Sequence, residues 1–299
     1  MGAGRGSPDL ESMDSQVTST SSRPFSISCR DRELDLGRPA IMGVLNVTPD
    51  SFSDGGRFFS PDRAVGHAIR MHEAGAAIID IGGESTRPGA AEVPWQQELD
   101  RVIPVIEALH SRVEAIISID TSKPAVMREA VAAGADLVND VCALGTEDAM
   151  ETVRDLQAAV CLMHMQGTPR TMQASPRYDN VVTEVRDFLA DRARACIDMG
   201  IAGNRILVDP GFGFGKTLEH NLDLLRGLQA LGHIGLPVVA GLSRKSFVGK
   251  ITGNDMDDRV FGSVALALAA VREGASIVRV HDVKATADAL KVWNAVYGR

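Results

Sequence analysis

The chain has 299 residues, a formal net charge of −8 and an apolar fraction of 44%. The apolar fraction supports a sizeable core, and the negative charge argues against nucleic acid or an anionic membrane as a partner of the whole surface. No apolar run approaches the roughly 20 residues of a membrane-spanning helix, and the four cysteines include no CxxC pair. We therefore expect a cytoplasmic protein with reduced cysteines.

The chain begins with residues 1–22, a stretch rich in Ser, Thr, Gly and Asp and without hydrophobic periodicity. This composition predicts a disordered tail that precedes one domain of residues 23–299. Residues 25–29 and 33–36 flank the polar turn Arg30-Asp31-Arg32, which predicts a short hairpin at the start of that domain.

After the hairpin, short apolar strands alternate with longer helical patterns. Strands are expected at residues 41–45, 77–81, 116–119, 137–138, 160–163, 206–208, 238–240 and 277–280. Helices are expected at residues 62–74, 96–109, 125–133, 147–156, 181–199, 218–231, 259–273 and 283–295. Roughly eight strand–helix units over about 260 residues favour a (β/α)8 TIM barrel. A doubly wound sheet is the alternative, because periodicity alone does not show closure.

A glycine-rich stretch, DPGFGFGK, follows the sixth strand at residues 209–216. A P-loop needs a glycine five residues before its Gly-Lys pair, but Pro210 stands at that position, and the Rossmann spacing is absent as well. The stretch is therefore not predicted to bind a mononucleotide. Its glycines allow the backbone to turn tightly and approach a ligand, while Phe212 and Phe214 supply flat walls.

Polar residues gather at the carboxyl ends of the predicted strands, where ligands bind in both candidate folds. They are Asn46, Asp80, Asp120, Asn139, Asp140, His164, Asp209, Ser243, Arg244, Lys245, Arg279 and His281. Helix N-caps are the alternative explanation for single Asp, Asn or Ser residues. That explanation does not extend to Lys245, Arg279 and His281, whose side chains do not cap helices in this way.

The chemistry of this set suits a flat heterocycle with an anionic arm. Asp120, Asn139 and Asp209 offer acceptors for adjacent N–H donors of a ring, and Lys245 offers a donor. Arg279 and His281 are two apart on a strand and would form one cationic patch for phosphate or carboxylate. Asn46 and the loop that follows it would help to hold a divalent cation, for which oxygen ligands and phosphate favour Mg²⁺.

Seven motifs in this order resemble those of dihydropteroate synthase. They are MGVLNVTPDSFSDGG (residues 42–56), GGESTRPGA (82–90), SIDTSKP (118–124), LMHMQGTP (162–169), DPGFGFGK (209–216), GLSRKS (241–246) and RVHDV (279–283). The resemblance implies a TIM barrel that joins p-aminobenzoate to 6-hydroxymethyl-7,8-dihydropterin diphosphate in folate synthesis and releases diphosphate. It also implies a homodimer, Mg²⁺ as cofactor, and inhibition by sulfonamides that compete with p-aminobenzoate.

The resemblance implies a role for each matching residue. The pterin would be held by Asp120, Asn139, Asp209 and Lys245, and the diphosphate by Arg279, His281 and Thr86. Mg²⁺ would contact Asn46, and p-aminobenzoate would be surrounded by Phe52, Arg87, Pro88, Phe214 and Ser243. The implied reaction is dissociative and would be catalysed mainly by Arg279, His281, Lys245 and Asp209, without a protein nucleophile.

Two other functions share parts of this pattern. The methyltetrahydrofolate domain of cobalamin-dependent methyltransferases shares the Asp/Asn pocket, and a pterin-binding barrel without synthase activity would retain only part of the set. The diphosphate ligands and the STRPG and SRKS loops are all present in this chain, which favours the active synthase.

Overall fold

The computed structural model describes residues 26–48, 60–85, 92–168 and 170–298. Its centre is an eight-stranded parallel sheet in the order β8-β7-β6-β5-β4-β3-β10-β9. The strands are β3 (Ala40–Asn46), β4 (Ile78–Gly82), β5 (Ile116–Asp120), β6 (Leu137–Asp140), β7 (Ala159–Met163), β8 (Ile206–Asp209), β9 (Val239–Ala240) and β10 (Ile277–Val280). One parallel bridge between Val208 and Val238 joins the two edges of the sheet. The predicted barrel is thus confirmed, and the doubly wound alternative is wrong.

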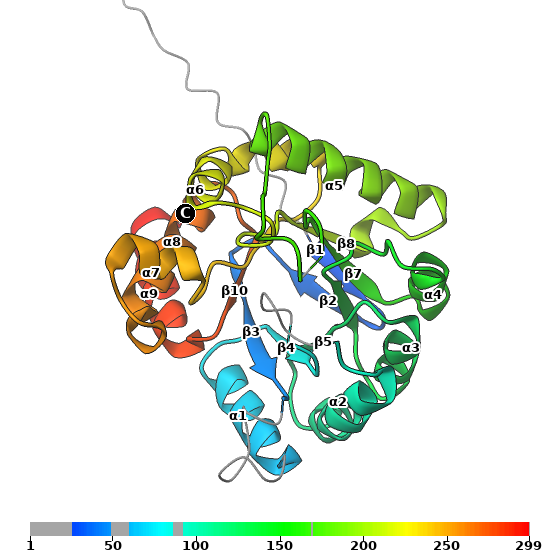
Figure 1. The fold of residues 1–299 in the computed structure, drawn as a ribbon. Helices are drawn as coiled ribbons and strands as arrows, with labels where there is room; N and C mark the ends of the chain where they lie inside the picture. Colours follow the sequence, from blue (N-terminus) through cyan, green and yellow to red (C-terminus); the bar gives the residue numbers. More distant parts are fainter. Residues whose placement is uncertain (1–25, 49–59, 86–91, 169, 299) are drawn as a thin grey trace, which may run out of the picture.

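Helices surround the sheet on its outer face, as the end-on view shows (Figure 1). They are α1 (Pro61–Glu73), α2 (Trp95–His110), α3 (Pro124–Ala132), α4 (Ala149–Leu156), α5 (Val181–Asp198), α6 (Leu218–Arg226), α7 (Ser246–Thr252), α8 (Val260–Arg272) and α9 (Val283–Tyr297). Three 3-10 helices, η1 (Gly203–Arg205), η2 (Leu228–Ile234) and η3 (Met256–Asp258), complete the described elements. Within the described residues, no helix has the length and apolarity to cross a membrane.

Four helices, α1, α3, α5 and α8, end in the same hydrogen-bonded turn. Gly75, Gly134, Gly200 and Gly274 each have a positive φ, between 99° and 119°. In α1 the glycine N–H donates to the carbonyl of His72, and the next N–H, of Ala76, donates to the carbonyl of Met71. This Schellman pattern satisfies carbonyls that a helix end otherwise leaves unpaired, and it directs the chain back into the following strand.

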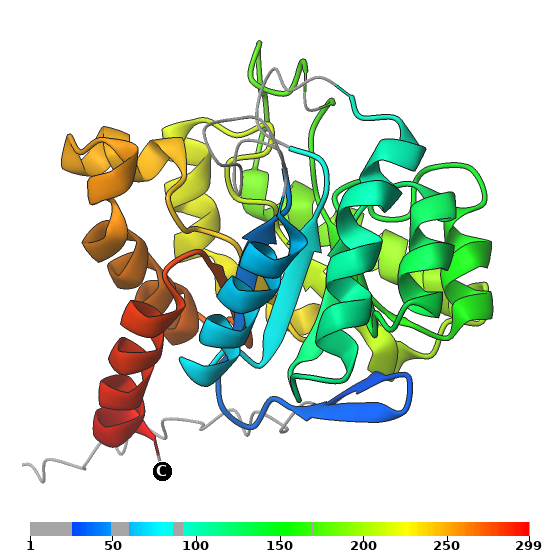
Figure 2. The same cartoon turned by 90° about the horizontal axis from the view of Figure 1, so that it is seen from below.

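A hairpin of β1 (Ser26–Cys29) and β2 (Arg32–Asp35) closes the end of the barrel at which the strands begin. Figure 2 shows it below the strands, at the bottom of the view. Ile27 and Cys29 pack against the first residues of the strands, among them Met42 and Ile78. Arg32 donates to the carbonyl of Ala115 and to the carboxylate of Asp136, each at 3.0 Å. The predicted hairpin is confirmed, whereas residues 1–22 lie outside the described residues.

Two helix predictions need correction. Residues 218–231 were expected to form one helix, but α6 ends at Arg226 and η2 follows. Gly227 lies between them because a Cβ atom there would stand 2.7 Å from Cγ2 of Val182 on α5. The short helix α7 was not expected, since SFVGKIT has only seven residues and a central glycine that weakens the helical pattern.

Candidate active site

Arg279 on β10 is held between two carboxylates at the mouth of the barrel. Its Nε donates to Asp80 at 2.6 Å and its Nη2 to Asp120 at 2.7 Å. Asp80 is fully buried and also accepts from Ser118 Oγ at 2.6 Å and from Asn139 Nδ2 at 3.1 Å. Burial raises the pKa of Asp120 to about 7, although Arg279 opposes this shift. The two aspartates therefore orient the guanidinium and offset much of its charge.

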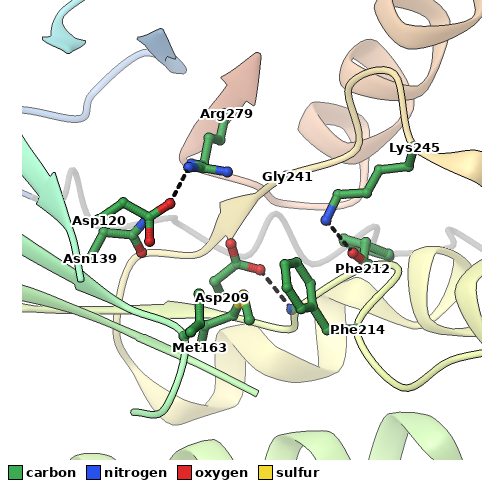
Figure 3. A pocket seen from close by; sticks show the side chains of 11 residues that line it. Asp120, Asn139, Met163, Asp209, Phe212, Phe214, Gly241, Lys245 and Arg279 are labelled. Atoms are coloured by element: carbon green, nitrogen blue, oxygen red, sulfur yellow. Dashed lines mark hydrogen bonds and ion pairs between the residues drawn. The ribbon is translucent and has the colours of Figure 1, made fainter. Parts of the chain in front are cut away.

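Asp120 and Arg279, joined by their ion pair, are among the residues that line a pocket (Figure 3). Its wall residues come from β5, β6, β7, β8, β10 and the loops that follow the strands. They are Asp120, Asn139, Val141, Met163, Asp209, Gly211, Phe212, Phe214, Gly241, Lys245 and Arg279. Four residues expected to hold a pterin, Asp120, Asn139, Asp209 and Lys245, are thus brought together around one cavity.

Asp209 occupies the last position of β8 and is 4% exposed. Its Oδ1 accepts from the Gly211 N–H at 2.7 Å, which fixes the carboxylate against its own loop. Burial raises the pKa of Asp209, and the Gly211 hydrogen bond and the Lys245 charge oppose that shift. Asp209 is not a helix cap, since α6 is capped by Thr217. Its position inside the pocket favours the ligand-binding interpretation over the capping one.

The glycine-rich loop after β8 is held at each of its carbonyls from Gly211 to Gly215. Lys216 Nζ donates to the carbonyls of Gly211 and Phe214, each at 3.0 Å. Phe212, Gly213 and Gly215 accept from Lys245 at 2.6 Å, Gln173 at 2.5 Å and Tyr178 at 2.9 Å, respectively. Because its carbonyls are satisfied by side chains from several elements, the loop is preorganised for a ligand.

Lys245 joins this loop to the pocket. Its backbone is the N-cap residue of α7, but its side chain makes no cap and reaches into the site instead. The ammonium lies 4.1 Å from the centre of the Phe214 ring, within the range of a cation–π interaction. Burial lowers the pKa of Lys245 to about 7, against the attraction of Asp209. Lys245 therefore provides a hydrogen-bond donor in the pocket. Because its pKa is about 7, it is also able to exchange a proton near neutral pH.

His281 and Ser243 lie next to each other at the ends of β10 and β9. The backbone N–H of His281 donates to Ser243 Oγ at 3.2 Å, and its Nδ1 lies 3.2 Å from the same oxygen. Burial, together with the positive charges of Arg279 and Arg244, lowers the pKa of His281 to about 4. A pKa of about 4 makes His281 neutral near pH 7, so the charge of the expected Arg279–His281 patch comes from Arg279.

Asn46 ends β3 and stands in register with Gly82, which is itself in register with Asp120. It thus reaches the same end of the barrel as the pocket. Within the described ranges, no group of three or more His, Cys, Asp or Glu side chains is arranged to hold a metal ion. The amide oxygen of Asn46 suits a hard cation such as Mg²⁺, which commonly takes its other ligands from water and substrate phosphates. The donor set is thus compatible with Mg²⁺ on a bound diphosphate.

Comparisons with known proteins agree with this geometry. Residues 42–281 match the family described as pterin binding enzyme. The chain is 55% identical over 262 residues to dihydropteroate synthase of Haemophilus influenzae, and the match covers 88% of this chain and 95% of that protein. A Xanthomonas albilineans dihydropteroate synthase with 4-aminobenzoic acid superposes with a TM-score of 0.88 at 51% identity, covering 93% of this chain and 100% of the other. The complex of the Xanthomonas enzyme with 7,8-dihydropteroate gives a TM-score of 0.84 at 49% identity, covering 92% and 99%.

The chain belongs to the dihydropteroate synthase family. Four residues that the resemblance to this family singled out, Phe52, Thr86, Arg87 and Pro88, lie outside the described residues. Phe214 lines the pocket, whereas Ser243 contacts His281 and neither of these two is among the wall residues.

Asp80 and Lys216 are buried residues that hold pocket residues in place, and the sequence predictions assigned them no role. Asp80 was noticed at its strand end, but its role depends on the register of β4, β5 and β10, which the sequence does not show. Lys216 directly follows the glycine-rich loop and is 3% exposed. The position of Lys216 directly after three closely spaced glycines is the sequence feature that could have indicated its role. His164, one of the polar residues at the strand ends, lies 2.9 Å from Lys216 Nζ and is not among the wall residues of the pocket.

Proposed function

We propose that this chain is a dihydropteroate synthase, which condenses 6-hydroxymethyl-7,8-dihydropterin diphosphate with p-aminobenzoate to give 7,8-dihydropteroate and diphosphate. The observation that carries the proposal is the pocket that unites Asp120, Asn139, Asp209 and Lys245 at the carboxyl ends of the strands. The Xanthomonas relatives with 4-aminobenzoic acid and with 7,8-dihydropteroate support the same substrates and product for this chain.

The proposed roles follow from donors and acceptors. Asp209 and Asn139 accept hydrogen bonds from the N–H groups of the pterin, and Lys245 donates to a ring nitrogen or carbonyl. Arg279 and neutral His281 donate to the diphosphate together with Thr86. Phe52, Arg87, Pro88, Phe214 and Ser243 surround p-aminobenzoate. Phe214 is suited to this role because its ring faces the Lys245 ammonium at the pocket edge.

The proposed reaction breaks the bond between the pterin methylene carbon and the diphosphate oxygen, and both electrons leave with diphosphate. The neutral aniline nitrogen then attacks the resulting cation and loses a proton. Carboxylate Asp209 beside the ring favours positive charge on the pterin. A protein nucleophile is not required, and burial raises the pKa of Cys29, Cys161 and Cys196 above the range of a reactive thiol.

Mg²⁺ is proposed as cofactor, held by Asn46 and by the diphosphate oxygens. When bound, the ion would neutralise charge on the departing diphosphate. Arg279 is already paired with Asp80 and Asp120, which supports a further cation at the phosphates.

A homodimer is proposed as the assembly. Three large apolar side chains stand exposed on neighbouring elements: Ile251 on α7 is 51% exposed, Met256 on η3 is 45% exposed and Phe261 on α8 is 87% exposed. Exposed apolar side chains on neighbouring elements favour an interface, and closed two-fold dimers are the commonest oligomers.

The proposed function is tested by measuring dihydropteroate and diphosphate formation with and without p-aminobenzoate. A synthase forms both products only when p-aminobenzoate and Mg²⁺ are present. The methyltransferase-like and inactive alternatives predict pterin binding without dihydropteroate. Asp209→Ala is the matched negative variant, and calorimetry should show that it loses pterin binding, since hydrogen bonds to charged groups contribute about 1.5–3 kcal/mol. Normal pterin binding by this variant would refute the proposed ring position.

Sulfonamides provide a second test of the p-aminobenzoate site. Rates are measured at rising p-aminobenzoate and a fixed sulfonamide concentration. Competition raises the apparent KM and leaves the maximal rate unchanged. A falling maximal rate at constant KM would contradict a shared site.

A further inference from the structure

Lys216 lies beneath the pocket, outside the set of residues that contact the proposed substrates. Its side chain is 3% exposed, and Nζ has three neighbours within hydrogen-bond distance. Two are the carbonyl oxygens of Gly211 and Phe214, each at 3.0 Å, and the third is Nδ1 of His164 at 2.9 Å. The nitrogen thus bridges the start of the glycine-rich loop, its fourth residue and the end of β7.

The bridge holds in either protonation state of Lys216. A charged ammonium donates to both carbonyls and to His164. A neutral amine still donates to both carbonyls and accepts from a protonated Nδ1. Burial lowers the pKa of Lys216 to about 7 and that of His164 to about 3. The contacts with the loop therefore do not depend on which of these states is populated.

The two carbonyls differ in how far they depend on Lys216. The Gly211 carbonyl also accepts from the Phe214 N–H at 3.1 Å, and Asp209 is tied separately to the Gly211 N–H. Within the described residues, the Phe214 carbonyl has Lys216 as its hydrogen-bond donor and no second one. Loss of the amine would therefore leave the Phe214 carbonyl without a donor, whereas the Asp209 end of the loop would keep its own hydrogen bonds.

Lys216 is 3% exposed, so its amine is largely shielded from solvent. A Cβ atom on Gly211 would stand 1.9 Å from the carbonyl oxygen of His164, and one on Gly215 would stand 2.6 Å from that of Gln166. The loop therefore lies directly on the segment that follows β7. An unpaired buried carbonyl costs free energy, so the loop would shift to find another donor.

We propose that Lys216 is a positioning residue that fixes the Phe214 ring against Lys245, and thereby sets the affinity for p-aminobenzoate more than that for the pterin. This inference rests on the proposed function, in which Phe214 contacts p-aminobenzoate and Asp209 contacts the pterin. A residue of general structural importance would instead affect both substrates alike, or affect stability alone.

The test compares Lys216→Met with wild type in steady-state kinetics and in calorimetry. We expect the KM for p-aminobenzoate to rise about tenfold, whereas the Kd for the pterin diphosphate changes less than about threefold. Lys250→Met is the control, because Lys250 is exposed on α7 and makes none of these contacts. It should leave both constants unchanged. Circular dichroism verifies that each variant is folded.

A double-mutant cycle with Phe214→Ala identifies the route of the effect. If Lys216 acts through Phe214, adding Lys216→Met to Phe214→Ala raises the KM little further. Independent, additive effects would overturn the inference, as would equal changes in both substrate constants. Should Lys216→Met fail to fold, Lys216→Gln enters the same comparisons, because its amide nitrogen lies one bond nearer the backbone than Nζ and would not reach both carbonyls. Wild type that forms no dihydropteroate would instead refute the proposed function, so the two failures are distinguishable.

Discussion

Asp80 links three strands through one buried carboxylate. It accepts from Arg279 on β10, Ser118 on β5 and Asn139 on β6. In Asp80→Asn the amide would present a donor where acceptors are needed, so Arg279 would lose its orientation. We expect kcat/KM to fall at least about tenfold, measured by steady-state kinetics, because hydrogen bonds to charged groups contribute roughly 1.5–3 kcal/mol. Asp155→Asn is the control, since Asp155 is an exposed residue paired with Arg154. An unchanged kcat/KM in Asp80→Asn would contradict the orienting role.

His164 makes the protein sensitive to acid. Burial and the nearby Lys216 lower its pKa from 6.5 to about 3, so between these values the unfolded state binds a proton that the folded state does not. Its contribution to stability is complete above about pH 6.5 and is lost as the pH falls toward 3. Urea unfolding at pH 7 and pH 5 should show a loss that is roughly 1–2 kcal/mol smaller in His164→Gln than in wild type. Equal losses would show that His164 titrates normally.

At the scale of the element, the Schellman glycines differ in what surrounds them. A Cβ atom at Gly274 would meet nothing within 4 Å, whereas one at Gly134 would stand 2.6 Å from the His110 ring. Gly274→Ala should therefore cost only the strain of a positive φ, about 1–2 kcal/mol, and Gly134→Ala should cost more. Urea unfolding of the two variants measures the difference. The reverse order would mean that strain in the turn of α8 outweighs the clash in that of α3.

At the scale of the whole molecule, the proposed dimer makes a prediction about Phe261. This side chain is 87% exposed in the single chain. Phe261→Asp would bury a charge in the proposed interface, which is costly when unpaired. Light scattering after gel filtration should show a dimer for wild type and a monomer for the variant. Glu219→Asp, on α6 outside the proposed interface, should remain dimeric. A monomeric wild type would refute the assembly.

Much of the barrel was predictable from the sequence because each strand is a short apolar run that ends in a polar residue. The carboxyl ends of parallel strands lie at the same end of the barrel, so Asp120, Asn139, Asp209 and Lys245 were expected to lie close together. The structure places all four around one pocket. What the sequence did not show depends on distances across the sheet. The pairing of Arg279 with Asp80 requires strand register, and the lowered pKa of His281 requires burial among other cations. The break between α6 and η2 depends on contact with α5, a neighbour on the barrel surface.

The single bridge between Val208 and Val238 has a consequence for the dynamics of the closed sheet. β9 has two residues, so the seam between β8 and β9 has fewer ladder hydrogen bonds than the other junctions and should open most readily. Asp209 lies on one side of this seam, and Ser243 and Lys245 follow β9 on the other. A pterin held by Asp209 and Lys245 would span the seam. Amide hydrogen exchange should therefore slow around Val238–Ala240 when the pterin binds, and much less in β4 and β5. The substrate would then connect β8 to the segment after β9, where the sheet's own hydrogen bonds are few, and would stabilise the closed barrel while it is bound.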